Sequence, residues 1–333
     1  MKILITGATG FIGERVVVSL VKDSIYPVCT ARKTSNVERL LELGVNIEYC
    51  DIGDLGELRE IFLKIKPDIV IHSAAKVIAP KDELYEANVT GTLNVCKASL
   101  ESGVKRLVYL SSVAVINGNP QRPLTDDMPY KATADYGETK IKAEKIVLEY
   151  REKGLPSAVI RPCIVYGENE PHALDKIFKT MKQWPIFIPA KSNEQSSRHP
   201  ERSEGSQQAG PNDACQLVYV ENVVDLIKLC MTKNEALEGT FISADKEILS
   251  LREIIKIIAE ELGKGKVREI PSFILKAIRM VPKINDFYEQ VFKIRTYDIS
   301  RAVNILGYVP NVSTELGLRR TVKHWLSLGT GVF

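Results

Sequence analysis

The first half of the chain alternates short β-prone segments with longer segments of helical periodicity. Strands separated by helices run parallel, because each crossover helix returns the chain to the same end of the sheet. Ile69–Ile71 and Leu107–Leu110 are continuously apolar, which is typical of strands in a sheet covered by helices on both faces. The predicted strands are Ile3–Thr6, Pro27–Thr30, Val45–Cys50, Asp68–His72, Arg106–Ser111 and Ser157–Arg161.

The intervening helices are predicted at Phe11–Val21, Val37–Leu43, Leu55–Lys64, Asp82–Ser102 and Thr133–Lys153. We therefore predict an α/β fold, with a Rossmann-type doubly wound parallel sheet in residues 1–165. The alternation weakens after Arg161, and residues 166–333 are predicted to form a smaller, interleaved C-terminal substrate-binding region. Its predicted elements are helices Ala173–Gln183, Asn222–Met231, Leu251–Leu262 and Thr314–Leu328, strand Leu217–Val220 and the short apolar run Ile186–Ile188.

Two segments depart from this pattern. Residues 191–211 are polar and almost free of apolar side chains, so they cannot bury enough surface to order themselves, and we predict a disordered insertion. A long loop of this kind is otherwise functional, for example as a substrate lid. Pro271–Lys283 is apolar with three basic residues; an ordinary helix of the second region is favoured over a membrane-surface helix.

The composition excludes several classes of protein. The formal net charge is +3, from 45 Lys and Arg against 42 Asp and Glu, which favours neither nucleic acid nor an anionic membrane as partner. No apolar stretch approaches the ~18–20 residues of a membrane span. Met1 leads directly into the first strand, so we expect no signal peptide and a cytoplasmic protein. The six cysteines show no zinc-site spacing, and we predict no metal.

A glycine-rich turn follows the first predicted strand. Gly7, Gly10 and Gly13 have the spacing G-x-x-G-x-x-G between Ile3–Thr6 and helix Phe11–Val21. Gly7 allows the tight turn, Gly10 lets the backbone approach a pyrophosphate, and Gly13 lets the helix pack closely on the strand. The phosphates would meet free N–H groups at the positive end of the helix dipole. This strand–turn–helix context predicts a dinucleotide site.

Further motifs follow the glycine turn in a characteristic order. They are Cys50–Ile52, Ile71–Ala75, Asn88–Thr92, Leu110–Ser112, Tyr136–Lys140, Arg161–Pro162 with Tyr166–Gly167, and Val218–Val223. Together they resemble the extended short-chain dehydrogenase/reductases, also called the NAD-dependent epimerase/dehydratase family. The resemblance covers nearly the whole chain outside residues 191–211, and it is specific for the family but not for a substrate.

Tyr136 and Lys140 form the Tyr-x-x-x-Lys pair of that family, and the resemblance implies that they are catalytic. The i, i+4 spacing places both side chains on one face of a helix. A free phenol has a pKa of about 10, too high for a base at neutral pH. A neighbouring ammonium and a cationic nicotinamide are expected to lower the pKa of Tyr136, so that it exchanges the substrate proton while hydride moves. Lys140 is also expected to hold the nicotinamide ribose.

The third catalytic residue should be a hydroxyl at the end of the fifth strand, where it steadies charge on the substrate oxygen. The family often reads Ser-Ser-x-Ala-Val-Tyr-Gly, and alignment with Ser111–Asn117 favours Ser112. Ile116 and Asn117 replace the Tyr-Gly pair, however, which leaves the register open by one residue. If Gly118 were the family glycine, the position would fall on Val113, which has no hydroxyl.

The resemblance also implies the residues that contact the cofactor. After the second strand, Arg32 and Lys33 stand where NAD-preferring members have an acidic residue, and this favours NADP over NAD. We expect His72 to be a structural hydrogen-bonding residue rather than a proton carrier. The expected cofactor-binding residues are Gly7, Thr9, Gly10, Phe11, Ile12, Gly13, Arg32, Lys33, Asp51, Ile52, Ser73, Ala74, Ala75, Asn88, Tyr136, Lys140 and Pro162.

These motifs imply an NAD(P)-dependent oxidoreductase that transfers hydride between nicotinamide and a secondary alcohol or ketone, with Tyr136 as acid and base. The alternative is a nucleotide-sugar epimerase or dehydratase that keeps NAD tightly bound. A cofactor-sensing regulator with a degenerate site is disfavoured by the intact Tyr136 and Lys140. The expected partner is a small-molecule substrate. A homodimer through helices Asp82–Ser102 and Thr133–Lys153 is as compatible with the sequence as a monomer.

Overall fold

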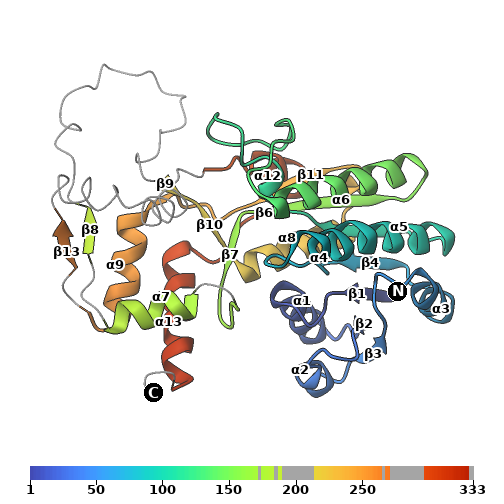
Figure 1. Cartoon of the computed structure of the whole chain (residues 1–333), viewed down its shortest axis with the longest axis horizontal. Helices are drawn as coiled ribbons and strands as arrows, with labels where there is room; N and C mark the ends of the chain where they lie inside the picture. Colours follow the sequence, from blue (N-terminus) through green and yellow to red (C-terminus); the bar gives the residue numbers. More distant parts are fainter. Residues whose placement is uncertain (172–173, 184–186, 190–213, 265–266, 271–295, 330–333) are drawn as a thin grey trace. The chain divides into compact units, whose positions relative to one another are not determined.

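The computed structural model describes residues 1–171, 174–183, 187–189, 214–264, 267–270 and 296–329 (Figure 1). The chain forms two compact units. The first comprises Met1–Val165, Val218–Ala244 and Tyr297–Val312, and the second comprises Tyr166–Leu217, Asp245–Thr296 and Ser313–Phe333. The predicted insertion at 191–211 and the predicted helix at 271–283 lie outside the described residues.

A seven-stranded parallel sheet forms the centre of the first unit, in the order β11-β6-β5-β4-β1-β2-β3. The strand order reverses between β1 and β4, where Thr6 pairs with His72, and such a switch point is the usual ligand site of an open α/β sheet. The prediction of a doubly wound parallel sheet is confirmed. The strands are β1 (Ile3–Thr6), β2 (Val28–Ala31), β3 (Asn46–Tyr49), β4 (Ile69–His72), β5 (Arg106–Leu110), β6 (Ser157–Pro162) and β11 (Thr240–Ser243).

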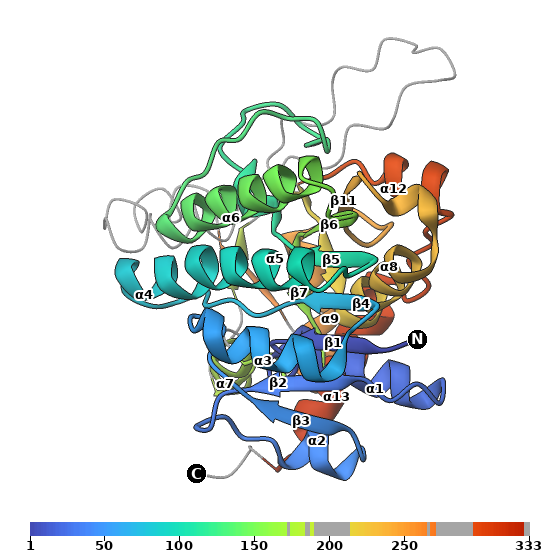
Figure 2. The same cartoon turned by 90° about the vertical axis from the view of Figure 1, so that its right-hand side faces the viewer.

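Helices cover both faces of this sheet because alternate strand residues point to opposite sides. Ile3 and Ile5 pack in one apolar core and Leu4 in the other. The first core lies beneath α1 (Phe11–Lys22), α2 (Glu38–Glu42), α8 (Val220–Thr232) and α12 (Ser300–Leu306). The second lies beneath α3 (Leu55–Ile65), α5 (Gly91–Glu101) and α6 (Asp135–Glu152), which lie side by side in Figure 2.

Strand β11 was not predicted from the sequence. Its four residues follow α8 and pair parallel with β6, with Phe241 opposite Ile160 and Ile242 opposite Arg161. Its strand conformation comes from the hydrogen bonds that the edge of β6 offers, and from the burial of Phe241 and Ile242 in the first core.

The helix predicted at 82–102 contains a π-helical turn. The structure has α4 (Lys81–Tyr85), then the π turn η1 (Glu86–Thr90), and then α5. The wider turn contains Asn88, which is 1% exposed. Such bulges occur frequently at functional sites, and Asn88 contacts the candidate site described below.

The second unit is smaller and mixed. Helix α9 (Leu251–Glu261) begins with a capping box between Ser250 and Glu253 and packs against α13 (Thr314–Ser327). The remaining elements of the described residues are η2 (Val113–Val115), β7 (Ile164–Tyr166), α7 (Leu174–Gln183), β8 (Phe187–Pro189), β9 (Ala214–Cys215), β10 (Leu217–Tyr219), η4 (Asn234–Ala236), β12 (Leu249–Ser250) and β13 (Arg268–Ile270). Among the described residues, no helix combines the length and apolar character that crossing a membrane requires.

Candidate functional site

The turn between β1 and α1 is built so tightly that only glycine fits at two positions. Gly7 has φ of +78°, and a Cβ there would lie 2.4 Å from the backbone nitrogen of Ala74. A Cβ on Gly13 would lie 2.1 Å from the carbonyl oxygen of Gly7. Gly10 caps α1 without a side-chain hydrogen bond to the first turn. The turn therefore presents backbone N–H groups at a helix N-terminus, which suits a dinucleotide pyrophosphate.

Gly13→Ala is expected to lower the free energy of unfolding by about 2–3 kcal/mol, because the added methyl group meets backbone that cannot move aside. Gly10→Ala is the matched control, since its Cβ would lie 3.2 Å from the nearest backbone atom, the carbonyl oxygen of Gly7. Chemical denaturation of both variants measures the difference. Equal stability of the two would contradict the close packing of α1 on β1.

A cavity of about 460 Å³ opens beside this turn, at the switch point between β1 and β4. Nine of the predicted cofactor residues line it: Gly7, Thr9, Gly10, Arg32, Asp51, Ile52, Ser73, Ala74 and Ala75. The other predicted residues are not part of its lining, namely Phe11, Ile12, Gly13, Lys33, Asn88, Tyr136, Lys140 and Pro162. Further lining residues were not among the predicted cofactor residues, namely Thr30, Ala31, Ser35, Cys50, Lys76, Glu83, Glu86 and Ala87.

The cavity wall after β2 contains one of the two predicted basic residues. Arg32 and Ser35 line it, whereas Lys33 is exposed and is not part of the lining. Asp51, after β3, is also in the lining, but one of its carboxylate oxygens accepts a hydrogen bond from the backbone N–H of Gly53 at 2.9 Å. This end of the cavity therefore presents a guanidinium, a hydroxyl and a carboxylate to a ligand.

Tyr136 lies in the first turn of α6 and Lys140 in the next. Lys140 is 2% exposed; its ammonium donates a hydrogen bond to the carbonyl of Leu110 at 2.5 Å and lies 4.5 Å from the centre of the Tyr109 ring. Burial lowers the pKa of Lys140 to about 7, opposed by the negative charge of Glu144. The amine is thus held at the end of β5 and can change protonation near neutral pH.

Ser112, and not its neighbour Ser111, lies beside the tyrosine. Burial raises the pKa of Tyr136 to about 12, and a hydrogen bond with Ser112 opposes that rise. Ser112 also accepts a hydrogen bond from the N–H of Ala114. The hydroxyl of Ser111 is instead turned to Glu144. The expected lowering of the Tyr136 pKa is not produced by the protein groups, because loss of solvent outweighs them.

Asn88 connects the loop after β4 to helix α6. Its side-chain oxygen accepts from the N–H of Lys76 at 2.8 Å, and its amide donates to Thr139 at 3.0 Å. The Thr139 hydroxyl donates to the carbonyl of Tyr136 at 2.8 Å. Through these hydrogen bonds the π turn holds the first turn of α6 in place. Asn88 acts on the backbone that carries Tyr136 and does not line the cavity.

His72 is fully buried, and both of its ring nitrogens are in hydrogen bonds. Nδ1 bonds the Thr6 hydroxyl at 2.6 Å and Nε2 bonds the Thr92 hydroxyl at 3.0 Å. Burial and the nearby charge of Lys140 lower the pKa of His72 to about 3. An imidazole that stays neutral and bonded on both sides joins β1 and β4 to α5, as expected of a structural residue.

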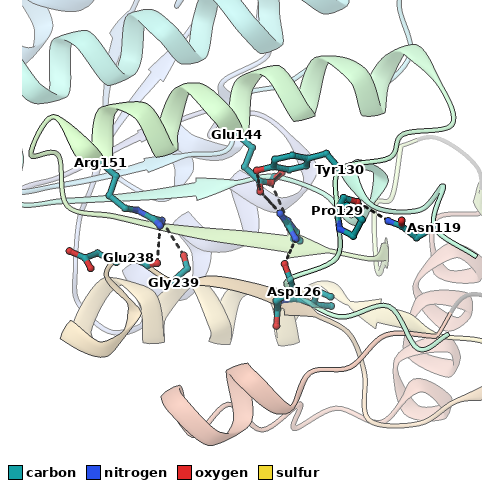
Figure 3. A network of polar contacts seen from close by, with 11 residues as sticks. Asn119, Asp126, Pro129, Tyr130, Glu144, Arg151, Glu238 and Gly239 are labelled. Carbon is teal, nitrogen blue, oxygen red and sulfur yellow. Dashed lines mark hydrogen bonds and ion pairs between the residues drawn. The ribbon is translucent and has the colours of Figure 1, made fainter. Parts of the chain in front are cut away.

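Glu144 is a site residue that the sequence analysis missed. Its carboxylate is fully buried one helical turn beyond Lys140 and pairs with Arg161 of β6 (Figure 3). The sequence motif contained Arg161 next to Pro162, but nothing in it indicated the partner. The described residues contain no cluster of His, Cys, Asp or Glu that could hold a metal ion.

Known proteins resemble this chain over most of its length. The family model of the NAD dependent epimerase/dehydratase family matches residues 3–242. UDP-glucose 4-epimerase of Vibrio cholerae is 28% identical over 97% of this chain and 95% of its own length. The 2-alkyl-3-oxoalkanoate reductase of Stenotrophomonas maltophilia is 27% identical over 96% and 98%.

Solved structures share the fold. UDP-glucose 4-epimerase of Thermotoga maritima with UDP-glucose superposes with a TM-score of 0.78 at 24% identity, covering 98% of this chain and 99% of that one. The UDP-glucose 4-epimerase of Thermus thermophilus, in complex with NAD, gives 0.75 at 23% identity, covering 98% and 99%. With its glycine turn, its parallel sheet and the match over residues 3–242, this chain belongs to the NAD-dependent epimerase/dehydratase family of enzymes.

Proposed function

We propose that this enzyme is an NAD(P)-dependent oxidoreductase that transfers hydride between nicotinamide and a secondary alcohol or ketone. The observation that carries the proposal is the placement of Tyr136, Lys140 and Ser112 together, where β5 ends and α6 begins. Open parallel sheets bind their ligands at the carboxyl ends of the strands. The cavity beside the glycine turn lies at that edge of the sheet.

The proposed chemistry follows from these three side chains. The bound nicotinamide supplies the hydride acceptor or donor, and its positive charge when oxidised favours the phenolate. Tyr136 Oη takes the proton of the substrate hydroxyl during oxidation and returns it during reduction. The Ser112 hydroxyl donates to the same substrate oxygen and stabilises charge there. The Lys140 ammonium holds the ribose hydroxyls and favours the ionised phenol.

A second candidate is a nucleotide-sugar epimerase or dehydratase, which would return the hydride to the same substrate. The full-length relative named UDP-glucose 4-epimerase favours it. Denaturing the freshly purified enzyme and quantifying the released nicotinamide distinguishes the two candidates. Near-stoichiometric NAD would support the epimerase or dehydratase. Little cofactor, or exchangeable NADPH, would support the dehydrogenase, and mass spectrometry of products from ketones and nucleotide sugars then identifies the substrate class.

We further propose a preference for NADP. Arg32 lines the cavity and no acidic residue stands at the end of β2, so a 2′-phosphate would meet a guanidinium. Arg32→Ala is expected to weaken NADPH binding about tenfold, the loss of one charge-assisted hydrogen bond, and NADH binding much less. Lys33→Ala is the matched control, because Lys33 is exposed outside the cavity. Equal losses for both cofactors in Arg32→Ala would remove the case for NADP.

A further inference from the structure

The carboxylate of Glu144 lies where a charge is costly. Glu144 follows Lys140 by four residues on α6, so the two side chains lie on one side of the helix. The residue has no exposed surface. Removing a carboxylate from water costs several kcal/mol unless other groups bond it well. An apolar side chain at this position would avoid that cost, so the buried carboxylate of Glu144 points to a specific role.

Three elements supply the partners of this carboxylate (Figure 3). Ser111, directly after β5, donates its hydroxyl at 2.5 Å. Tyr130, in the segment before α6, donates its phenol at 2.9 Å. Arg161 of β6 donates through Nη2 at 2.5 Å and through Nε at 3.1 Å. One side chain of the catalytic helix thus holds the ends of two neighbouring strands.

The guanidinium of Arg161 is itself anchored. Its Nη1 donates to the carbonyl of Asp126 at 2.6 Å, and the carboxylate of Asp126 accepts from the N–H of Ile242 on β11 at 2.6 Å. Arg161 and Ile242 are also register partners across β6 and β11. The ion pair therefore does not move independently of the sheet, and it gives α6 one defined position against it.

We propose that Glu144 is a positioning residue for the reaction proposed above, holding Lys140 and the Ser111–Ser112 end of β5 in one arrangement toward the cofactor. The inference rests on the proposed function, because it takes Lys140 as a contact of the nicotinamide ribose. Glu144 touches no ligand in this scheme. It acts through the hydroxyl of Ser111 and through its charge.

The charge acts on Lys140. Among the described residues, Glu144 of the same helix, Tyr109 of β5 and His72 of β4 interact with Lys140. Tyr136 stands one turn earlier on α6. His72 is neutral and both phenols are protonated at neutral pH, since burial lowers the pKa of His72 and raises the pKa of each tyrosine. Glu144 is therefore the negative charge that opposes desolvation and keeps Lys140 protonated to higher pH.

NADH binding as a function of pH tests this inference without a substrate. NADH fluorescence reports binding, and its dihydronicotinamide ring carries no charge to oppose the ammonium. Affinity is expected to weaken as rising pH removes the Lys140 proton. In Glu144→Gln the Lys140 pKa falls further, so the midpoint should move about one unit to lower pH. Glu144→Asp retains the charge and should restore the midpoint.

Glu149→Gln is the matched control. Glu149 stands on the same helix, is exposed and pairs with Lys153 at the surface, so its loss should leave the midpoint unchanged. Lys140→Met should remove the pH dependence altogether. Suppose that the pH midpoint of NADH binding in Glu144→Gln equals that of the wild type, while Lys140→Met still abolishes the pH dependence. This result overturns the role of Glu144 and leaves the proposed cofactor contact of Lys140 standing. Identical NADH binding by Lys140→Met and wild type at every pH overturns the proposed cofactor contact, and the inference with it.

Glu144→Gln leaves Arg161 buried without its counter-ion, and circular dichroism checks whether the variant folds. If it does not, Glu144→Gln with Arg161→Gln removes both buried charges. The midpoint should then still move to lower pH, by less than in the single variant, because the charge that acts on Lys140 is that of Glu144. An unchanged or raised midpoint in the double variant would overturn the inference.

Discussion

Replacing Tyr136 with phenylalanine is expected to lower turnover by about 10³-fold, the range attributed to a positioned acid–base group, while NADH still binds. Only the phenolic oxygen is lost, and the cavity beside the glycine turn is lined by other residues. Initial rates with the substrate found by product analysis, together with NADH titration, measure the two effects.

Tyr150→Phe is the control for this experiment. Tyr150 lies on the same helix and is buried in the core beneath α6, away from the cavity lining. It should retain the wild-type rate. A Tyr136→Phe enzyme with more than about a tenth of the wild-type rate, well above the expected loss, would exclude Tyr136 as the acid and base.

Arg161→Met is expected to lower the free energy of unfolding by about 3–5 kcal/mol, because it leaves the carboxylate of Glu144 buried without a counter-charge. The two side chains are 5% and 0% exposed, so water cannot replace the lost contact. Chemical denaturation measures the loss. Combining Arg161→Met with Glu144→Gln removes both charges and should recover part of it.

Arg39→Met provides a matched control, since Arg39 pairs with Glu42 at the surface, where both side chains are more than half exposed. Exposed pairs contribute little, and stability should hardly change. If Arg161→Met lowered the free energy of unfolding no more than Arg39→Met does, the buried ion pair would not be what holds α6 against the sheet.

Local patterns sufficed for much of the site. The glycine turn depends on three residues within one strand–turn–helix unit, and the i, i+4 spacing places Tyr136 and Lys140 on one face of a helix, while the resemblance to the family implies that they are catalytic. Both are properties of neighbouring residues, which can be recognised before the chain is folded. The six strands of the first half could also be predicted, because each is a short β-prone segment between helical segments.

Other features depend on contacts between distant segments. Ser35 and Lys76 line the cavity although no sequence motif contains either residue. The sheet brings them together because the ends of β2 and β4 lie at one edge. In the sequence Glu144 looks like one more charged residue of a polar helix. Only packing against β5 and β6 shows that it is buried and paired with Arg161.

The sequence alone thus determined the parallel sheet, the glycine-rich turn and the placement of Tyr136 and Lys140 on one helix, because strand and helix periods and glycine geometry are local. The expected catalytic role of the pair rests on the resemblance to the family. The tertiary structure decided the seventh strand β11, the partners of Glu144 and the direction of the pKa shifts at Tyr136 and Lys140. Desolvation sets those shifts. How much water a side chain loses depends on everything that packs around it, which no short stretch of sequence contains.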